Sequence, residues 1–168
     1  MNPRYIWARW LFYGLAAALF LLLQSVVLWR IRVWGIHPFV LPVLVAVAAS
    51  WEERQEGICA AAVFGLLTDL TLSPPIPCFY LLTFTASAFL AGLVAKRWIL
   101  PGFFCAVAVS VAAFIINGAF HALILSFRGI QDLATAAAIT GRELLLTAPL
   151  IPPVYLLFHR IHRRFPAE

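Results

Sequence analysis

Long apolar runs, separated by short charged or proline-rich segments, dominate this sequence of 168 residues. A helix that crosses a bilayer needs roughly 20 mainly apolar residues, with a range of about 17–25. The charged breaks divide the chain into six segments near that length. The predicted spans are 10–28, 33–51, 57–72, 76–95, 102–126 and 133–158, the last with a break near 141–143. We therefore predict an all-α polytopic membrane bundle, with residues 1–168 forming a single transmembrane domain.

The composition agrees with this pattern. Hydrophobic residues make up 64% of the chain and charged residues only 11%. A soluble domain carries roughly 25% charged residues and about 45–50% apolar ones. A soluble fold of this length could not bury so much apolar surface, so we expect the surplus to face the lipid bilayer.

The basic residues predict an orientation. With six spans and the N-terminus inside, the cytoplasmic segments hold Arg4, Arg9, Arg54, Lys96, Arg97, Arg160, Arg163 and Arg164. The outer segments hold Arg30, Arg32 and Arg128, with Arg142 unassigned. Positive residues concentrate on the cytoplasmic side of membrane proteins. This favours a multi-pass membrane protein with both termini in the cytoplasm. Short basic clusters between apolar runs, despite the net charge of +5, also argue against nucleic-acid binding.

The third predicted span contains small residues at a regular spacing. Gly57, Ala61, Gly65 and Asp69 recur every four residues, so they lie on one face of a helix. Small residues at this spacing allow another backbone to approach closely. The face could pack within the bundle, or it could bind a helix of a membrane partner.

Asp69 is the only acidic residue well inside an apolar stretch. A carboxylate at membrane depth is costly and normally faces protein or water. Three roles are open: accepting backbone hydrogen bonds where the chain turns before Pro74 and Pro75, contacting a partner or ligand, and coupling to protons. The first is the least costly because it places the carboxylate near the membrane surface.

Three further polar residues lie in apolar surroundings. Asn117 and His121 are one helical turn apart, which predicts hydrogen bonds to a neighbouring helix. Arg142 interrupts the last span, and we hypothesise that it pairs with Asp69 because each would otherwise be an isolated charge. No second His or Cys stands at a useful spacing, so neither a metal nor a cofactor is expected.

Catalytic chemistry has little support in the sequence. Phosphate loops, zinc-binding helices and nucleophile elbows are missing from it. Glu52, Glu53 and Glu56 cluster, but they are expected to be solvated in a short cytoplasmic turn. The three cysteines are predicted to act as small buried apolar residues. We expect a protein that is not an enzyme.

The segment from His37 to Leu93 carries a family resemblance. A proline-led span is followed by a Glu-rich turn with Gly57 and then by Phe-Gly-Leu-Leu-Thr-Asp-Leu, which contains Gly65, Leu66 and Asp69. This pattern resembles the bacterial rod-shape-determining MreD family. The chain departs from the family where a glycine is usual soon after the aspartate, because Pro74-Pro75-Ile76-Pro77 stands there.

The resemblance implies a function that composition does not. Members of this family are non-enzymatic components of the cell-elongation machinery, which supports peptidoglycan synthesis and rod shape. They associate with the bitopic protein MreC and, through it, with MreB filaments, the glycosyltransferase RodA and its transpeptidase. Their fold resembles the substrate-binding subunits of energy-coupling-factor transporters, so a small-molecule-binding subunit of a vitamin-type transporter is the alternative.

Overall fold

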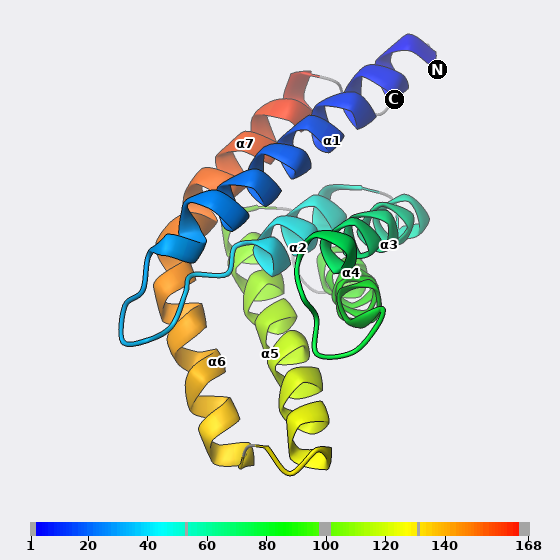
Figure 1. The fold of residues 1–168 in the computed structure, drawn as a ribbon. Coiled ribbons are helices and arrows are strands. Elements are labelled where there is room, and N and C mark those ends of the chain that lie inside the picture. The colour runs from blue at the N-terminus through cyan, green and yellow to red at the C-terminus, as the bar shows by residue number, and fades with distance from the viewer. Residues whose placement is uncertain (1–2, 53, 98–101, 131, 165–168) are drawn as a thin grey trace.

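The computed structural model describes residues 3–52, 54–97, 102–130 and 132–164. In this part of the chain the regular elements are helical, and the one extended pairing is an isolated bridge between Val33 and Ile36. The elements are α1 (Pro3–Val26), η1 (Leu28–Arg30), α2 (Leu41–Trp51), α3 (Arg54–Thr71), α4 (Phe79–Arg97), α5 (Phe103–Phe127), α6 (Leu133–Thr147), η2 (Ala148–Leu150) and α7 (Ile151–Arg164) (Figure 1). The all-α prediction is confirmed.

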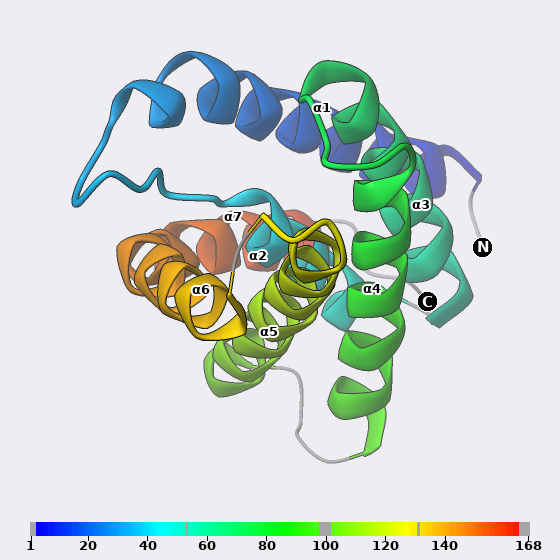
Figure 2. The ribbon, with the colours of Figure 1, turned by 60° about the horizontal axis from the view of Figure 1, so that its bottom comes forward.

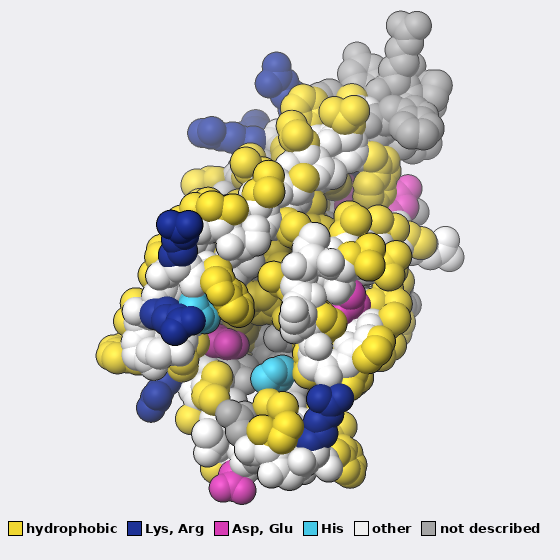
Figure 3. All heavy atoms as spheres, in the orientation of Figure 1, with side chains coloured by type: hydrophobic (Ala, Val, Ile, Leu, Met, Phe, Trp, Pro, Cys, Tyr) yellow, Lys and Arg dark blue, Asp and Glu magenta, His cyan; other side chains and the backbone are white. Residues whose placement is uncertain are grey.

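Three stretches of the described chain are long and apolar enough to cross a membrane: Ala8–Arg30, Phe103–Phe127 and Ala134–Arg164. Two further apolar helices, Leu41–Trp51 and Phe79–Val94, are shorter. Hydrophobic side chains are spread over much of one face of the molecule, and Lys and Arg occur there in separate places (Figure 3). These features are those of a helical membrane protein.

Helix α2 forms the centre of the bundle. Every residue from Val40 to Val47 is buried. Helices α3, α4, α5 and α7 all pack against α2, whereas α1 crosses the bundle on its outer side (Figure 2). Because α2 is apolar on all sides, it can be buried against neighbours on every side.

The predicted second span, 33–51, is wrong in its first part. The chain from Val33 to Val40 is not helical, and Trp34 and Gly35 have φ angles of 54° and 77°. Pro38 adds a further constraint because a residue before proline avoids helical geometry. The eleven residues of α2 rise only about 16 Å, which is roughly half the hydrocarbon thickness of a bilayer.

The predicted break near 141–143 is also wrong. Helix α6 continues through Arg142, which is exposed, and the helix changes instead at η2, which contains Pro149. A charged residue keeps its backbone N–H and continues a helix when its side chain reaches the surface. Proline has no N–H to donate, so the bend forms there. The result is one bent rod made of α6, η2 and α7 (Figure 1).

Helices α1 and α2 run in opposite directions, and so do α5 and the rod made of α6, η2 and α7 (Figure 1). We name two ends of the bundle by a residue at each. The Glu52 end holds the first part of α1, the end of α2, the beginning of α3, and the last turns of α7, where His162 approaches Glu52. The Asp69 end holds the turn between α3 and α4, where Asp69 binds the start of α4.

Candidate functional site

Asp69 binds the N-terminus of α4. The backbone N–H of Tyr80 donates to Oδ1 of Asp69 at 2.9 Å, and the N–H of Leu81 donates to Oδ2 at 3.0 Å. The first N–H groups of a helix have no partner within the helix, and the positive end of the helix dipole favours a negative charge. Both carboxylate oxygens therefore accept backbone hydrogen bonds where the chain turns, which is the first of the three roles considered for Asp69.

The small residues of α3 lie against the chain itself. A Cβ added to Gly65 would be 2.7 Å from both Cα of Leu81 and the carbonyl oxygen of Tyr80. A Cβ added to Gly57 would be 3.2 Å from Cα of Ala49 in α2. Ala61, between them, is 3% exposed. Gly57, Ala61 and Gly65 are therefore used for packing within the bundle, which is one of the two roles predicted for this face.

Asp69 and Arg142 do not form the hypothesised pair. The ion pairs among the described residues join Arg9 and His162 to glutamates, and Arg142 is exposed. The carboxylate of Asp69 instead binds backbone N–H groups, which carry no formal charge but satisfy both oxygens. That hypothesis is therefore wrong.

Asn117 and His121 lie on α5. Asn117 is 8% exposed, and its Oδ1 is buried without a hydrogen-bond partner, so the predicted bond from this atom to a neighbouring helix is not formed. The ring of His121 packs edge-on against Phe79, with 6.0 Å between the ring centroids. Next to Asn117, Gly118 lies tightly against the side chain of Thr140 in α6. His121 and Gly118 thus take part in the packing of α5 against α4 and α6.

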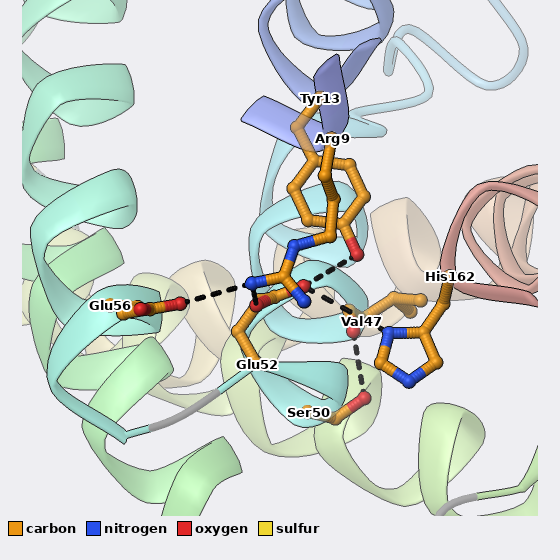
Figure 4. A network of polar contacts seen from close by, with 7 residues as sticks. All are labelled: Arg9, Tyr13, Val47, Ser50, Glu52, Glu56 and His162. Atoms are coloured by element: carbon orange, nitrogen blue, oxygen red, sulfur yellow. Dashed lines mark hydrogen bonds and ion pairs between the residues drawn. The ribbon is translucent and has the colours of Figure 1, made fainter. Parts of the chain in front are cut away.

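A buried charge cluster joins four helices at the Glu52 end (Figure 4). Nη2 of Arg9 lies 2.9 Å from Oε2 of Glu52 and 3.3 Å from Oε2 of Glu56. The Tyr13 hydroxyl donates to Oε1 of Glu52 at 2.7 Å, and Nδ1 of His162 is 4.0 Å from the same oxygen. Arg9 and Glu52 are 5% and 6% exposed. The cluster therefore links α1, α2, α3 and α7.

This cluster was not anticipated from the sequence. Glu52 was expected to be solvated, and that expectation is wrong; Glu53 lies outside the described residues. Burial raises the pKa of Glu52, and the Tyr13 hydrogen bond and the charge of Arg9 act in the opposite direction. One feature of the sequence could have indicated the cluster: Arg9 and Tyr13 are four residues apart, so they share one face of α1.

Helix α1 is also bound at its other end. Nε2 of Gln24 donates to the carbonyl oxygen of Pro38 at 3.0 Å, and the N–H of Val40 donates to Oε1 of Gln24 at 3.0 Å. Gln24 is 2% exposed. Its amide therefore satisfies two backbone groups of the non-helical segment before α2. Polar contacts thus hold α1 near both of its ends.

Between these two attachments, a groove of about 1000 Å³ runs between α1 and α3, with α2 at its base. We call it the α1–α3 groove. Its lining is mainly apolar, with the polar side chains of Glu52, Gln55 and Glu56 at the Glu52 end and Thr71 toward the other end. Small residues from both walls border it: Gly14, Ala17, Ala18, Gly57, Ala60 and Ala61.

The cysteines differ in burial. Cys105 is buried as predicted, whereas Cys59 and Cys78 are exposed, Cys59 within the α1–α3 groove. Within the described residues, no three His, Cys, Asp or Glu side chains lie close enough to hold a metal ion.

The fold and these contacts define an all-helical protein with membrane-type helices and a lateral apolar groove. Comparisons with protein-family models, with curated proteins and with solved structures give no match. The resemblance to the MreD family therefore stays a prediction that rests on the residues between His37 and Leu93.

Proposed function

We propose that this protein is a non-enzymatic scaffold of a bacterial cytoplasmic membrane that supports peptidoglycan synthesis and rod cell shape through an MreC-like bitopic partner. One observation carries the proposal: the side chains of Gln24, Asp69 and the Arg9–Glu52 pair are used for internal contacts, while the α1–α3 groove is mainly apolar and open. Asp69, Gln24 and the Arg9–Glu52 pair each join elements of the chain itself. The unoccupied surface therefore suits association with a hydrophobic partner better than it suits catalysis.

The proposed topology has six passes with both termini in the cytoplasm. The first part of α1 and the last turns of α7 lie together at the Glu52 end, and α1 and α2 run in opposite directions (Figure 1). Of the basic residues, Arg9, Arg54, Arg160, Arg163 and Arg164 belong to segments at the Glu52 end, whereas Arg30, Arg32 and Arg128 belong to segments at the opposite end. The rule that positive charge stays inside then makes the Glu52 end cytoplasmic. The short helix α2 crosses only as part of the bundle, with protein on all sides.

Co-expression tests this proposal. The full chain and the MreC-like protein of the same organism are produced together, extracted in mild detergent and purified through a tag on this chain. We expect the partner to be recovered in a stable ratio, and an unrelated single-span protein expressed at the same level to be lost. Depletion of this chain in its host should round the cells. Normal rods on depletion, together with no recovered partner, would refute the scaffold.

A small-molecule-binding transport subunit remains the second candidate, and the size of the groove favours it. Ligand pockets usually have volumes of about 300–1000 Å³, and the groove is at the upper end of that range. Recognition of a vitamin needs several placed hydrogen-bonding groups, however, and those of the groove are confined to its two ends. Native mass spectrometry of the purified protein separates the two functions, because a transport subunit is expected to retain a stoichiometric small molecule.

A further inference from the structure

The α1–α3 groove is long enough to follow a helix through most of a bilayer. Its lining runs from Trp10 to Leu22 on α1 and from Gln55 to Thr71 on α3. At 1.5 Å per residue these walls are about 18 Å and about 24 Å long. A helix about 10 Å in diameter and about 24 Å long occupies roughly 1900 Å³, so a groove of about 1000 Å³ takes in about half of it.

The walls of the groove allow a helix backbone to approach closely. A Cβ added to Gly14 on α1 would meet no atom within 4 Å, so this position is open. Ala17 and Ala18 continue the α1 wall, and Ala60 continues the wall on α3. Transmembrane helices associate through small residues of this kind because hydrophobicity alone does not drive helices together in lipid. Acyl chains have no such requirement.

The charge at one end of the groove selects among occupants. The side chain of Glu56 is 42% exposed there, and Arg9 contacts only its Oε2. Gln55, next to it, also lines the groove and is exposed. An anionic lipid headgroup would be repelled by this carboxylate, whereas a single-span protein carries Lys or Arg near its cytoplasmic end. The charge is thus complementary to a helix with a basic cytoplasmic end.

We propose that the α1–α3 groove binds one transmembrane helix of a partner protein, with small residues on the helix face that enters the groove and a Lys or Arg beside Glu56. This inference rests on the proposed scaffold function and adds the place and the chemistry of the contact. It places the partner beside Gly57 and Ala61, which border the groove, and not at Gly65, which packs against α4.

Photocrosslinking tests the location. p-Benzoylphenylalanine replaces Leu22 or Val63, one on each wall, in the full chain co-expressed with the MreC-like partner. The matched control replaces Ile115 on α5, because Ile115 and Val63 are 61% and 63% exposed and only Val63 lines the groove. We expect the groove positions to crosslink to the transmembrane segment of the partner and Ile115 to crosslink to lipid alone.

Three other outcomes overturn the inference. If the partner co-purifies but crosslinks through Ile115, or equally through all three positions, the groove is not its site and the scaffold function stands. If the groove positions crosslink only to lipid in an intact complex, the occupant is an acyl chain. If no complex forms at all, the scaffold function and the inference both fail.

Two substitutions test the chemistry. Ala18→Phe fills the groove from an exposed position, and Ala119→Phe makes the same change at an exposed position of α5 outside it. We expect A18F to weaken partner binding by at least about tenfold and A119F to leave it unchanged. Glu56→Lys should also weaken binding, and changing the partner's facing basic residue to Glu should restore it. Unchanged binding in A18F, or no restoration by the charge exchange, would contradict the proposal.

Discussion

Gly65 is the position where the packing of α3 against α4 depends on a single hydrogen atom. A Cβ at this position would lie 2.7 Å from backbone atoms of Tyr80 and Leu81, which is inside van der Waals contact. Because those atoms belong to a helix backbone, they cannot move aside as a flexible side chain would. We therefore expect Gly65→Ala to push the two helices apart over the most extensive helix pair of the described chain.

The expected loss follows from two opposing terms. Overpacking of a well-packed core costs about 1–3 kcal/mol, and a gap of 0.5–1 Å removes roughly a quarter to a half of the dispersion energy of each contact. Ala is more favourable than Gly inside a helix by about 1 kcal/mol, which offsets part of this cost. The net expectation is a destabilisation of up to about 2 kcal/mol, or a decrease in Tm of up to about 8 °C for a domain of this size.

Thermal unfolding of the purified protein in one detergent measures this change. Gly141 provides the matched control because it lies within α6 and an added Cβ would meet no atom within 4 Å. Gly141→Ala gains the helix preference without the clash, so its Tm should equal or exceed that of the unmodified protein. If G65A were as stable as G141A, the close approach of α3 and α4 would not limit stability, and the reasoning would be refuted.

Three further predictions concern the charged residues. Asp69→Ala should lower the free energy of unfolding by about 0.5–2 kcal/mol because α4 loses its capping acceptor. Arg142→Gln should change this free energy little because Arg142 has no ion pair with Asp69. Equal losses in the two variants would disprove this prediction. Arg9→Gln should lower the free energy of unfolding by about 3–5 kcal/mol because it leaves the buried carboxylate of Glu52 uncompensated. The R9Q/E52Q double variant should lose less stability than the two single variants together. Additive losses would mean that Arg9 and Glu52 are not energetically coupled. Removal of Arg9 should also raise the pKa of Glu52 further above its ordinary value, so that the folded state binds the proton more tightly than the unfolded state. R9Q should therefore regain stability as the pH falls toward about 4.5. A Tm of R9Q that decreases on mild acidification, relative to that of the R9Q/E52Q double variant, would contradict this prediction.

The local elements followed from the sequence where one physical term dominated. The apolar runs predicted α4 and α5 to within three residues because long uninterrupted apolar stretches are stable in a bilayer only as helices. They also predicted the end of α1 to within two residues, but α1 begins seven residues earlier than predicted. Where two terms competed, the prediction was wrong. The segment before α2 is apolar enough for a helix, yet Gly35 and Pro38 prevent one. The prediction was wrong there because it considered only hydrophobicity and not the backbone geometry of these two residues.

The last rod shows the same competition in reverse. Arg142 and Glu143 were read as a break because charge is costly in lipid. In the structure α6 continues through them, and Pro149 produces the bend. A charge interrupts a span only if its side chain has no route to a polar surface, and that depends on neighbouring helices.

The sequence by itself determined that the chain is helical, that its surface is apolar, and that Gly65 and Asp69 are special positions on α3. These properties depend on residue type and on spacing along one helix. Only the tertiary structure decided what those residues contact. It placed the small face of α3 against α2 and α4, it buried the Arg9–Glu52 pair between helices 43 residues apart in the sequence, and it left the groove beside α1 open. Contacts between distant segments depend on how the helices pack, and no local pattern carries that information.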